Sequence, residues 1–596
     1  MDASTQQLTL AHVTHEAIEQ VGGIGTVLHG LFTSPPYRQR IGRSILIGPA
    51  TMPATASGQA RLGEHGEVLY SSTDGIDRSG MVPLLQPIEQ RFDVAVVYGK
   101  RRYEVSDQQD AVEVEVLLID VHHINRQRLD VFKLRLWETF GLDSSRYEGA
   151  WDYEEYVRLA EPACDALQAI LGDSEDPCVV FAHEFMGVPA ALAAKMQGDP
   201  RVRTVFHAHE CASARRVVED HEGHDVMFYN VLEEARRRGL YVEDVFGSLG
   251  HQFRHALVSL AHQCDAVIAV GDRVCEELKF LNEQYDRRRI DLVYNGVPAG
   301  KVDPEAKRRS RMMLQQYAVR LGLDEPDVLM THVTRPVISK GLWRDLSVCH
   351  ELDRALETEH RRAVLFILTS AAGVRPPDAV RSMEEQYGWP RRHHDGYPDL
   401  VGPEVDIHND IITFNAQHRA VQVVLVNQFG WNASRIGDRL PAGMDIIDLR
   451  RATDVEFGMA TYEPFGISPL EPLSSGALCV ISNVCGCRGF AWRANDGTEP
   501  RNIICADFTS LEQPLGLDEL MAMTRKERDR IEHAVVANVA SEILSRLPTT
   551  DQQRQSLMDS GQALAARMGW DRVIEADLIP LLDRISAESP RQAISP

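Results

Sequence analysis

Short apolar runs alternate with longer stretches of helical periodicity along almost the whole chain. This alternation is typical of parallel sheets whose strands are joined by crossover helices. A chain of 596 residues is too long for one hydrophobic core, so we expect at least two large domains. The apolar runs fall into two series on either side of a polar stretch near Gly296 to Pro326, which predicts an α/β protein with two Rossmann-like, doubly wound domains. The predicted strands are 8–13, 44–47, 94–97, 114–119, 179–182, 204–207, 266–270 and 291–294 in the first series, and 328–333, 363–368, 422–426, 444–448, 457–460, 478–482 and 503–506 in the second.

We predict the domain boundaries from the same pattern. Residues 1–298 form an N-terminal domain and residues 299–565 a C-terminal domain, which carries an insertion at about 371–420 that is rich in Pro, Gly and His. Long insertions of this kind are usually functional or make oligomer contacts. Residues 566–596 are expected to form a helix that packs back on the N-terminal domain, followed by a tail from Glu588.

The charge and cysteine content narrow the class of protein. The net charge of −24 argues against a partner with a phosphate backbone, so we expect no nucleic acid. The ten cysteines show no CxxC pairs, which fits a reducing compartment. The sequence starts without a basic segment followed by an apolar one, and it has no run of about 20 apolar residues. We therefore expect a cytoplasmic protein without a transmembrane segment.

Two carboxylates, Glu463 and Glu471, stand eight positions apart in the segment Tyr462 to Pro472. Between them lie a glycine, a serine suited to cap a helix and a proline suited to its first turn. A loop that ends at a helix N-terminus favours an anion, because free backbone N–H groups point outward there. The alternative for Glu471 is structural, since Ser468-Pro469-Leu470-Glu471 also matches a capping box.

Glycines follow the first predicted strand at Gly22, Gly23 and Gly25. Their amides could approach a phosphate or a sugar at the start of a helix. The spacing differs from the dinucleotide fingerprint GxGxxG, so NAD is not supported. The plain alternative is an ordinary turn between a strand and a helix.

Arg335 and Lys340 lie on the loop after the predicted strand 328–333. An arginine fork and a lysine point charge at a strand end could together bind a diphosphate. Two ordinary surface cations are the alternative.

Histidines follow two strands of the first domain. His183 and Glu184 end one strand, and His207, His209 and Glu210 end the next. A histidine at a strand end can bind a sugar hydroxyl or stabilise a charged transition state, and packing with a local hydrogen bond is the alternative. His207 and His209 share one face of their strand, yet no third ligand has the usual spacing, so we predict no metal.

Several segments in their order along the chain resemble glycogen synthases, in particular the animal and fungal branch of these retaining glycosyltransferases with two Rossmann-like domains (the GT-B fold). The resemblance is carried by 20–27, 47–49, 182–185, His209 with Arg215, 228–230, 294–296, 335–341 and 462–466. It implies transfer of glucose, with UDP-glucose favoured, to the non-reducing end of an α-1,4-glucan in glycogen biosynthesis. It implies an N-terminal domain on the acceptor side, a C-terminal domain for the nucleotide sugar, no cofactor and no obligatory metal.

The resemblance also assigns roles in the C-terminal domain. Arg335 and Lys340 would bind the phosphates, with donors from Gly466, Ile467 and Ser468. Glu471 would hold the ribose. Glu463 would lie near the sugar hydroxyls and the positive charge that develops on the sugar.

In the N-terminal domain the resemblance makes His209 catalytic and places Arg215 on the donor. Gly22, Gly23 and Gly25 would line the donor site, and His183 with Glu184 would face the acceptor. Two departures stand out: Gln20 replaces a lysine of the starch-type synthases, and the segment 524–530 has fewer basic residues than the regulatory helix of the animal and fungal enzymes. The insertion at 371–420 could support a homo-oligomer, as in that family.

Two other functions stay open. The same retaining chemistry could act on a small acceptor, such as a sugar phosphate or a glycerate derivative. A non-catalytic protein that binds a sugar nucleotide or a glucan is the third possibility, and a phosphorylase with pyridoxal phosphate shares the architecture. The sequence does not decide between UDP and ADP donors, the donor sugar, allosteric regulation or the oligomeric state.

Overall fold

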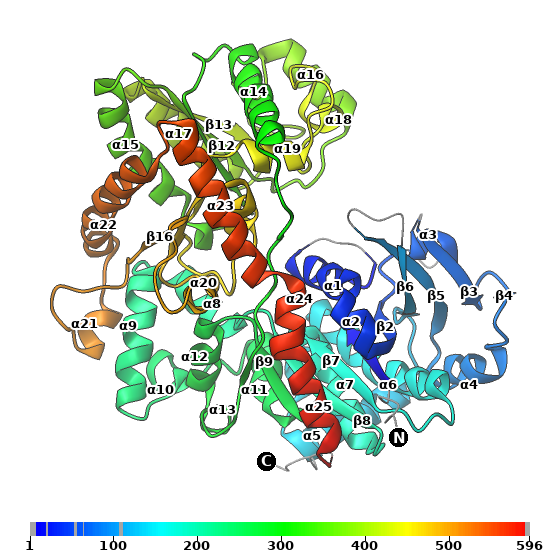
Figure 1. The fold of residues 1–596 in the computed structure, drawn as a ribbon. Coiled ribbons are helices and arrows are strands. Elements are labelled where there is room, and N and C mark those ends of the chain that lie inside the picture. Colours follow the sequence, from blue (N-terminus) through cyan, green and yellow to red (C-terminus); the bar gives the residue numbers. More distant parts are fainter. Residues whose placement is uncertain (1–6, 19–21, 53–55, 64, 106–110, 590–596) are drawn as a thin grey trace, which may run out of the picture. The chain divides into compact units, whose positions relative to one another are not determined.

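A computed structural model describes residues 7–18, 22–52, 56–63, 65–105 and 111–589 (Figure 1). Gln20 and most of the tail expected after Glu588 lie outside these ranges. The chain divides into two compact units. The first unit comprises Met1–Ser213, Arg238–Gly296 and Trp570–Pro596, and the second comprises Ala214–Arg237 and Val297–Gly569.

One segment groups differently from the predicted domain boundaries. Residues 214–237 fall within the expected N-terminal domain, whereas the structure places them in the second unit. The buried carboxylate of Asp225 explains this grouping, because it forms an ion pair of 2.7 Å with the buried Arg344 of the same unit. Glu532 pairs with the same guanidinium at 2.6 Å. A buried guanidinium needs such partners, so this segment belongs to the core of the second unit.

The first unit is built on a ten-stranded sheet in the order β10-β9-β8-β7-β1-β2-β6-β5-β3-β4. The strands from β10 to β6 run parallel, which agrees with the predicted Rossmann-like fold. The other end of the sheet is antiparallel, and its strands β3 and β4 were not predicted from the sequence. The strands are β1 (Leu8–Val13), β2 (Ile41–Pro49), β3 (Gly66–Ser71), β4 (Ile76–Asp77), β5 (Ala95–Glu104), β6 (Ala111–Asp120), β7 (Cys178–His183), β8 (Val202–Ala208), β9 (Ala266–Ala269) and β10 (Asp291–Leu292).

The helices of the first unit join these strands and cover the sheet. They are α1 (Gly23–Thr33), α2 (Pro35–Arg40), α3 (Gly58–Leu62), α4 (Val82–Phe92), α5 (Arg126–Phe140), α6 (Trp151–Leu171), α7 (Glu184–Gln197), α10 (Val242–Phe246), α11 (Phe253–Leu260), α12 (Asp272–Leu281), α13 (Glu283–Asp286), α24 (Trp570–Val573) and α25 (Ile579–Ala587). Helix α8 (Ala212–Asp220) begins in the first unit and ends in the second.

The C-terminal helices pack on the N-terminal residues of the first unit. Ser34 donates a hydrogen bond of 2.5 Å to Asp571, and Arg40 forms an ion pair of 2.6 Å with Asp583. The Trp570 indole lies so close to Gly30 that a Cβ at this position would collide with the ring. The end of the chain therefore contributes to the core of the first unit.

The second unit has a fully parallel six-stranded sheet in the order β13-β12-β11-β14-β15-β16, and Figure 1 labels its strands β12, β13 and β16. In chain order this is 3-2-1-4-5-6, the order of the dinucleotide-binding Rossmann fold. Its switch point lies between β11 and β14, whose connections leave in opposite directions. The strands are β11 (Val328–Val333), β12 (Ala363–Leu368), β13 (Val421–Val426), β14 (Val455–Gly458), β15 (Leu478–Ser482) and β16 (Ile503–Ala506).

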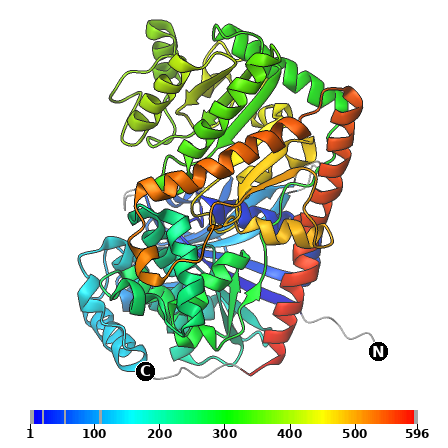
Figure 2. The ribbon, with the colours of Figure 1, turned by 90° about the vertical axis from the view of Figure 1, so that its left-hand side faces the viewer.

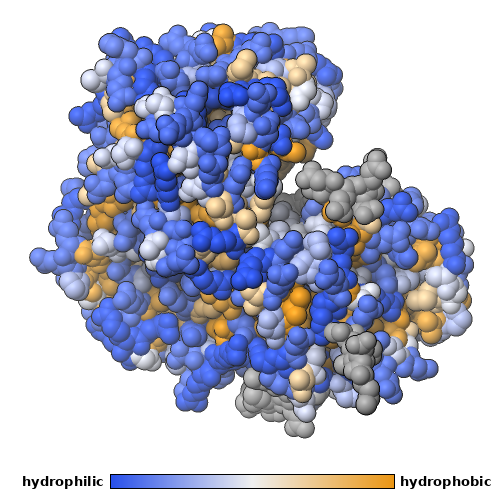
Figure 3. Space-filling view, in the orientation of Figure 1, coloured by the Kyte–Doolittle hydropathy of each residue, from blue (hydrophilic) through white to orange (hydrophobic). Residues whose placement is uncertain are grey.

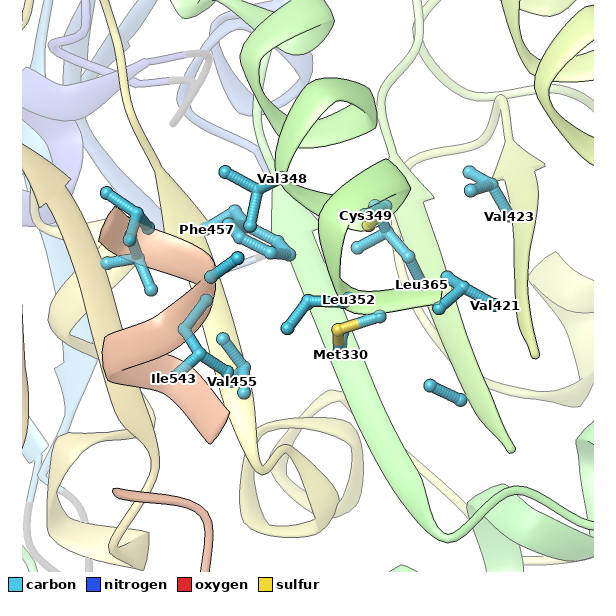
Figure 4. Packing of buried hydrophobic residues seen from close by; sticks show 14 of the residues in the cluster. Met330, Val348, Cys349, Leu352, Leu365, Val421, Val423, Val455, Phe457 and Ile543 are labelled. Carbon is cyan, nitrogen blue, oxygen red and sulfur yellow. The ribbon is translucent and has the colours of Figure 1, made fainter. Parts of the chain in front are cut away.

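Helices cover both faces of this sheet. One face packs on α15, α17 and α22 through Met330, Leu352, Leu365, Phe457 and Ile543 (Figure 4). The other face packs on α14, α16 and α19. Figure 2 shows α22 in orange, followed by α23 in red. The helices are α9 (His224–Arg237), α14 (Pro304–Arg320), α15 (Leu342–Thr358), α16 (Pro377–Tyr387), α17 (Glu404–Gln417), α18 (Ala433–Ile436), α19 (Ile446–Ala452), α20 (Cys487–Ala494), α21 (Leu517–Met521), α22 (Arg525–Arg546) and α23 (Asp551–Met568).

One predicted strand of the second unit is wrong. Residues 444–448 do not form a strand, because Asp445 caps the start of α19. Its side chain accepts a hydrogen bond of 3.0 Å from the Asp448 amide, and Asp448 accepts one of 3.3 Å from the Asp445 amide. This reciprocal capping satisfies two amides at once and outweighs the short apolar run.

The face shown in Figure 3 is mostly hydrophilic, with scattered apolar residues. Among the described residues we find no helix with the length and apolar character needed to span a membrane.

Candidate functional site

The loops after β11 and β14 carry the predicted phosphate-binding and carboxylate residues of the second unit. Lys340 ends a short 3-10 helix (Ile338–Lys340) after β11, and Glu463 lies on the loop after β14. Their side chains form an ion pair with Lys340 Nζ at 2.5 Å from Glu463 Oε2, and they are 13% and 17% exposed. Ligands of open α/β sheets bind beyond the carboxyl ends of the strands at such a switch point. The pair therefore lies where this fold places a ligand.

The Glu463 loop is held by backbone hydrogen bonds. The Thr461 amide donates to Ser339 O at 2.8 Å, and the Gly486 amide donates to Glu463 O at 2.9 Å. Gly466 has a φ of 90°, and a Cβ there would lie 2.7 Å from the Cys485 sulfur. Both the conformation and the space therefore require glycine at position 466. These contacts fix the carboxylate without a long helix.

Residues Ile467 and Ser468 do not begin an α-helix. Ser468–Leu470 form a single 3-10 turn preceded by Ile467, which makes no side-chain cap. Pro472 has no N–H to donate back to Ser468, so the hydrogen bond that would continue an α-helix here cannot form. The capping box that the sequence offered for Ser468 and Glu471 is therefore wrong.

Arg450 organises these two residues instead. Its guanidinium donates to Ser468 Oγ at 2.9 Å and forms an ion pair with Glu471. It also pairs with the buried Glu456 of β14 at 2.9 Å. Ser468 Oγ in turn donates to Val333 O at 2.6 Å. Arg450 is 8% exposed, and no sequence motif had marked it.

The two remaining arginines of the prediction lie in the second unit. Arg335 is exposed on the loop after β11, and within the described ranges its side chain makes no hydrogen bond or ion pair, while its carbonyl accepts one of 2.9 Å from the Val337 amide. Arg215 pairs with Glu219 at 3.0 Å, and the same carboxylate oxygen accepts a hydrogen bond of 2.7 Å from Ser339. Glu219 thus links Arg215 to the residue before Lys340, a connection that the sequence did not indicate.

In the first unit the glycines follow β1, which lies beside β7 at the switch point of that sheet. The Gly22 amide donates to Glu16 Oε2 at 3.0 Å, and the Gly25 amide donates to the same oxygen at 2.8 Å. Gly23 has open space where a Cβ would lie. A carboxylate of the protein itself therefore binds the amides at the start of α1, and Glu16 was not among the predicted site residues.

Histidines form a hydrogen-bonded chain across the same edge. His12 Nδ1 lies 3.0 Å from His183 Nε2, and His183 Nδ1 lies 2.8 Å from His209 Nε2. The chain continues from His12 Nε2 to the Tyr37 hydroxyl at 3.2 Å and from there to Ser44 Oγ at 2.9 Å. Each of these four hydrogen bonds needs one donor and one acceptor. The choice of donor in one bond therefore sets which nitrogen of each histidine carries the proton in the others.

His207 lies beside this chain. Its ring centroid is 4.1 Å from that of His209 and 5.2 Å from that of His183. Neither ring nitrogen has a hydrogen-bond partner among the described residues, although the side chain is only 5% exposed. Burial lowers the pKa of His207 to about 3. Burial also lowers the pKa of His183 and His209 well below the usual value, with neighbouring histidines as the second cause, so the three rings are neutral.

The two residues predicted for the acceptor are both buried. His183 is 0% exposed and makes the two imidazole contacts just described. Glu184 is 5% exposed and has a φ of 57°, which is uncommon for a residue with a Cβ. Its carboxylate accepts hydrogen bonds from the backbone amides of His209 and, at 2.7 Å, Glu210. Glu184 thus positions the strand end that carries His209.

Comparisons with known proteins agree with this architecture. Residues 106–301 match the profile of the family described as Glycosyltransferase Family 4. No curated protein matches the sequence.

Among solved structures, the chain is similar to the catalytic domain of starch synthase IV from Arabidopsis thaliana bound to ADP and acarbose, with a TM-score of 0.51 and 14% identity over 98% of this chain and 100% of that one. It is also similar to a UDP-forming α,α-trehalose-phosphate synthase from Burkholderia xenovorans in complex with glucose-6-phosphate, with a TM-score of 0.50 and 12% identity over the same shares. At this identity the likeness shows the fold, which is the GT-B fold with two Rossmann-like domains.

Proposed function

We propose that this protein, a glycosyltransferase with the GT-B fold, is a glycogen synthase-like enzyme that transfers glucose with retention from UDP-glucose to the non-reducing end of an α-1,4-glucan. The observation that carries the proposal is the Lys340–Glu463 pair at the switch point of the second unit. The exposed Arg335 on the same loop supplies a second cation for a diphosphate.

In the proposed reaction the bond between C1 of the sugar and the diphosphate oxygen breaks with both electrons leaving on the phosphate. Arg335 and Lys340 would stabilise the negative charge that develops there, which is the main task of a protein in this kind of transfer. The acceptor hydroxyl attacks C1 from the side that the diphosphate leaves, and its proton passes to a phosphate oxygen. No metal or other cofactor takes part in these steps.

Glu463 and Lys340 change partners in this proposal. Without a donor each neutralises the other at 2.5 Å in a mostly buried place. When a diphosphate binds, Lys340 turns toward it, and the Glu463 carboxylate is left beside the sugar, where it stabilises the positive charge on C1. Lys340 and Glu463 therefore each face an opposite charge both without and with the donor, which avoids the cost of a buried unpaired charge.

The other second-unit residues support donor binding. Glu471, held by Arg450, would accept hydrogen bonds from the ribose hydroxyls. Arg215 would assist the phosphates, since Glu219 holds it beside the loop of Lys340. Gly466, Ile467 and Ser468 would border the same donor.

The first unit would bind the acceptor and contact the transferred sugar through His209. Its imidazole is held by His183 at 2.8 Å, while Glu184 holds its backbone amide. His183 and Glu184 are therefore proposed to position His209 and the acceptor edge. All ten cysteines are free thiols, which supports placing the enzyme in the cytoplasm.

A small acceptor is the second candidate function. The trehalose-phosphate synthase structure noted above holds glucose-6-phosphate, and its fold is as similar to this chain as that of the starch synthase. The donor chemistry would be the same, and only the acceptor would differ.

The test measures nucleotide release from UDP-glucose and from ADP-glucose, each with glycogen, with glucose-6-phosphate and without an acceptor. The variant Glu463→Gln removes the negative charge and keeps the size of the side chain. Glu512→Gln, an exposed residue of the same unit, is the matched control. We expect glycogen-dependent release of UDP that is lost in Glu463→Gln and kept in Glu512→Gln.

The other outcomes separate the alternatives. Release that depends on glucose-6-phosphate would favour the small acceptor, and binding of UDP-glucose without release would favour a non-catalytic protein. Undiminished turnover in Glu463→Gln would refute the role of Glu463. An NMR analysis of the new bond, if it showed the β anomer, would exclude a retaining reaction.

A further inference from the structure

We propose that His183, His207 and His209 of the first unit form a binding site for a borderline divalent transition metal ion, with Zn²⁺ as the best fit. One nitrogen from each ring lies within 4.8 Å of the others. Three imidazoles with one open position are a common ligand set for Zn²⁺, whereas hard cations such as Mg²⁺ prefer oxygen ligands.

The third ligand is His183, which the sequence spacing did not indicate and which the strand register places beside His207. His183 ends β7 and is the direct neighbour of His207 on β8 in the parallel pairing. His209 follows His207 by two residues, and alternate residues of a strand point to the same face. Two rings from adjacent strands and a third from the residue directly after β8 therefore meet at one edge of the sheet, and the two strands hold their ligands firmly.

The ring nitrogens of the buried His207, unpaired over the described ranges, indicate that a ligand binds there. A buried imidazole normally makes a hydrogen bond with at least one nitrogen, yet within the described part of the chain His207 makes none. Nothing in the polar network explains why a histidine rather than an apolar residue occupies this position. A metal ion would satisfy one of its nitrogens.

The neighbours of the site provide the orientation that metal-binding histidines need. His183 can bind through Nδ1 while its Nε2 donates to His12 Nδ1 at 3.0 Å. His12 Nε2 then donates to Tyr37, whose hydroxyl donates to Ser44. Such outer partners fix the tautomer and the ring orientation of a ligand. The pKa values of the three histidines are lowered by burial, so the rings already have the neutral form that binds a metal.

Metal binding requires small changes in the rings. Two nitrogens bound to one Zn²⁺ at about 2.0–2.1 Å lie roughly 3.3 Å apart in a tetrahedral arrangement. The present spread of up to 4.8 Å closes by rotation of the side chains, and the hydrogen bond of 2.8 Å between His183 and His209 is replaced by the metal. A bound ion would therefore occupy the His209 nitrogen, which could then no longer contact the sugar.

This competition makes the site inhibitory if His209 contacts the sugar, a consequence that rests on the proposed function. Zn²⁺ would then lower glucosyl transfer, while a chelator would leave the activity of the metal-free enzyme intact. His207 is the informative position, because it belongs to the metal site and has no role in the proposed transfer.

The experiment measures Zn²⁺ binding to the full chain by competition with a chromophoric chelator. It compares the natural protein with His207→Asn and with His255→Asn, a histidine of the same unit that is 6% exposed and lies outside the three-residue cluster. We expect one tight site in the natural protein and in His255→Asn. In His207→Asn binding should be at least about tenfold weaker, since even outer-partner changes weaken metal sites by about 10–100-fold.

A second readout identifies the ligands. X-ray absorption of the Zn²⁺ complex should show nitrogen neighbours of the imidazole type at about 2.0 Å. Circular dichroism checks that each variant is folded, and His207→Gln replaces His207→Asn if the latter does not fold. Absence of saturable binding, or equal affinity in the natural protein and the folded His207 variant, would overturn the proposal.

The inhibition assay is a separate arm. In an active preparation, Zn²⁺ should inhibit transfer by the natural protein and have much less effect on His207→Asn. If the protein has no transfer activity, the binding data still decide the metal site. Failure of the proposed function and failure of the metal proposal are therefore distinguishable.

Discussion

Gly486→Ala tests whether the position of the Glu463 loop controls catalysis. A Cβ at Gly486 would lie 2.6 Å from the Pro464 carbonyl carbon, and closer still to its oxygen. Ordinary contacts of this kind begin near 3.4 Å, and the oxygen is the nearer atom, so the loop must move by more than about 1 Å. The Gly486 amide also donates to Glu463 O at 2.9 Å, so the shift acts directly on the proposed catalytic residue.

A displacement of about 1 Å at a reacting centre costs roughly a hundredfold in rate, which corresponds to about 2.7 kcal/mol of transition-state stabilisation. We therefore expect Gly486→Ala to lower the rate of sugar transfer by at least this factor. Overpacking would also destabilise the protein by roughly 1–3 kcal/mol. The variant changes no charge, so a loss of activity in the folded protein comes from geometry.

The assay is nucleotide release at saturating donor, together with a thermal melt that shows the fraction folded at the assay temperature. Gly300→Ala is the matched control, because it lies in the same unit and a Cβ there meets no atom within 4 Å. A folded Gly486→Ala protein with the rate of Gly300→Ala would refute the argument that this contact positions Glu463.

Two further predictions concern ion pairs of the second unit. Lys340→Met leaves Glu463 without its partner and removes a phosphate contact, so donor affinity should fall by roughly 2–5 kcal/mol in isothermal titration with UDP-glucose; unchanged affinity would remove Lys340 from the donor site. Arg344→Met leaves the buried Asp225 unpaired and should lower the free energy of unfolding by about 3–5 kcal/mol. In denaturant unfolding, the double variant Arg344→Met/Asp225→Asn should recover part of this loss, and a double variant less stable than the single one would contradict the explanation.

The sequence predicted most strands because buried parallel strands are nearly continuous apolar runs. The runs 328–333, 363–368, 478–482 and 503–506 match β11, β12, β15 and β16 residue for residue. Strands β3 and β4 at the antiparallel end of the first sheet were missed, because β4 has only two residues and both strands are only partly buried. The wrong strand at 444–448 had an apolar run as well, but its two aspartates cap a helix.

The fold class alone predicts that Lys340 and Glu463 lie at the same edge of the sheet, because each follows a strand that ends there. Their pairing, by contrast, depends on β11 and β14 being neighbours, and the strand order is not written in any local pattern. The same holds for His183 and His207, which the register of β7 and β8 brings together. A search by sequence spacing finds ligands on one element and misses those contributed by the next strand.

Arg450 is the clearest case of a residue of the candidate site that no sequence motif indicates. A buried arginine between Glu456 and Glu471 is required because the two carboxylates would otherwise repel each other, and the fully buried Glu456 has lost its hydration. The same guanidinium binds Ser468, so one side chain fixes the strand β14, the 3-10 turn and the carboxylate proposed for the ribose. Glu471 is therefore a structural partner of Arg450 rather than part of a helix cap, and this ion pair gives its carboxylate a fixed place for the ribose in the proposed function.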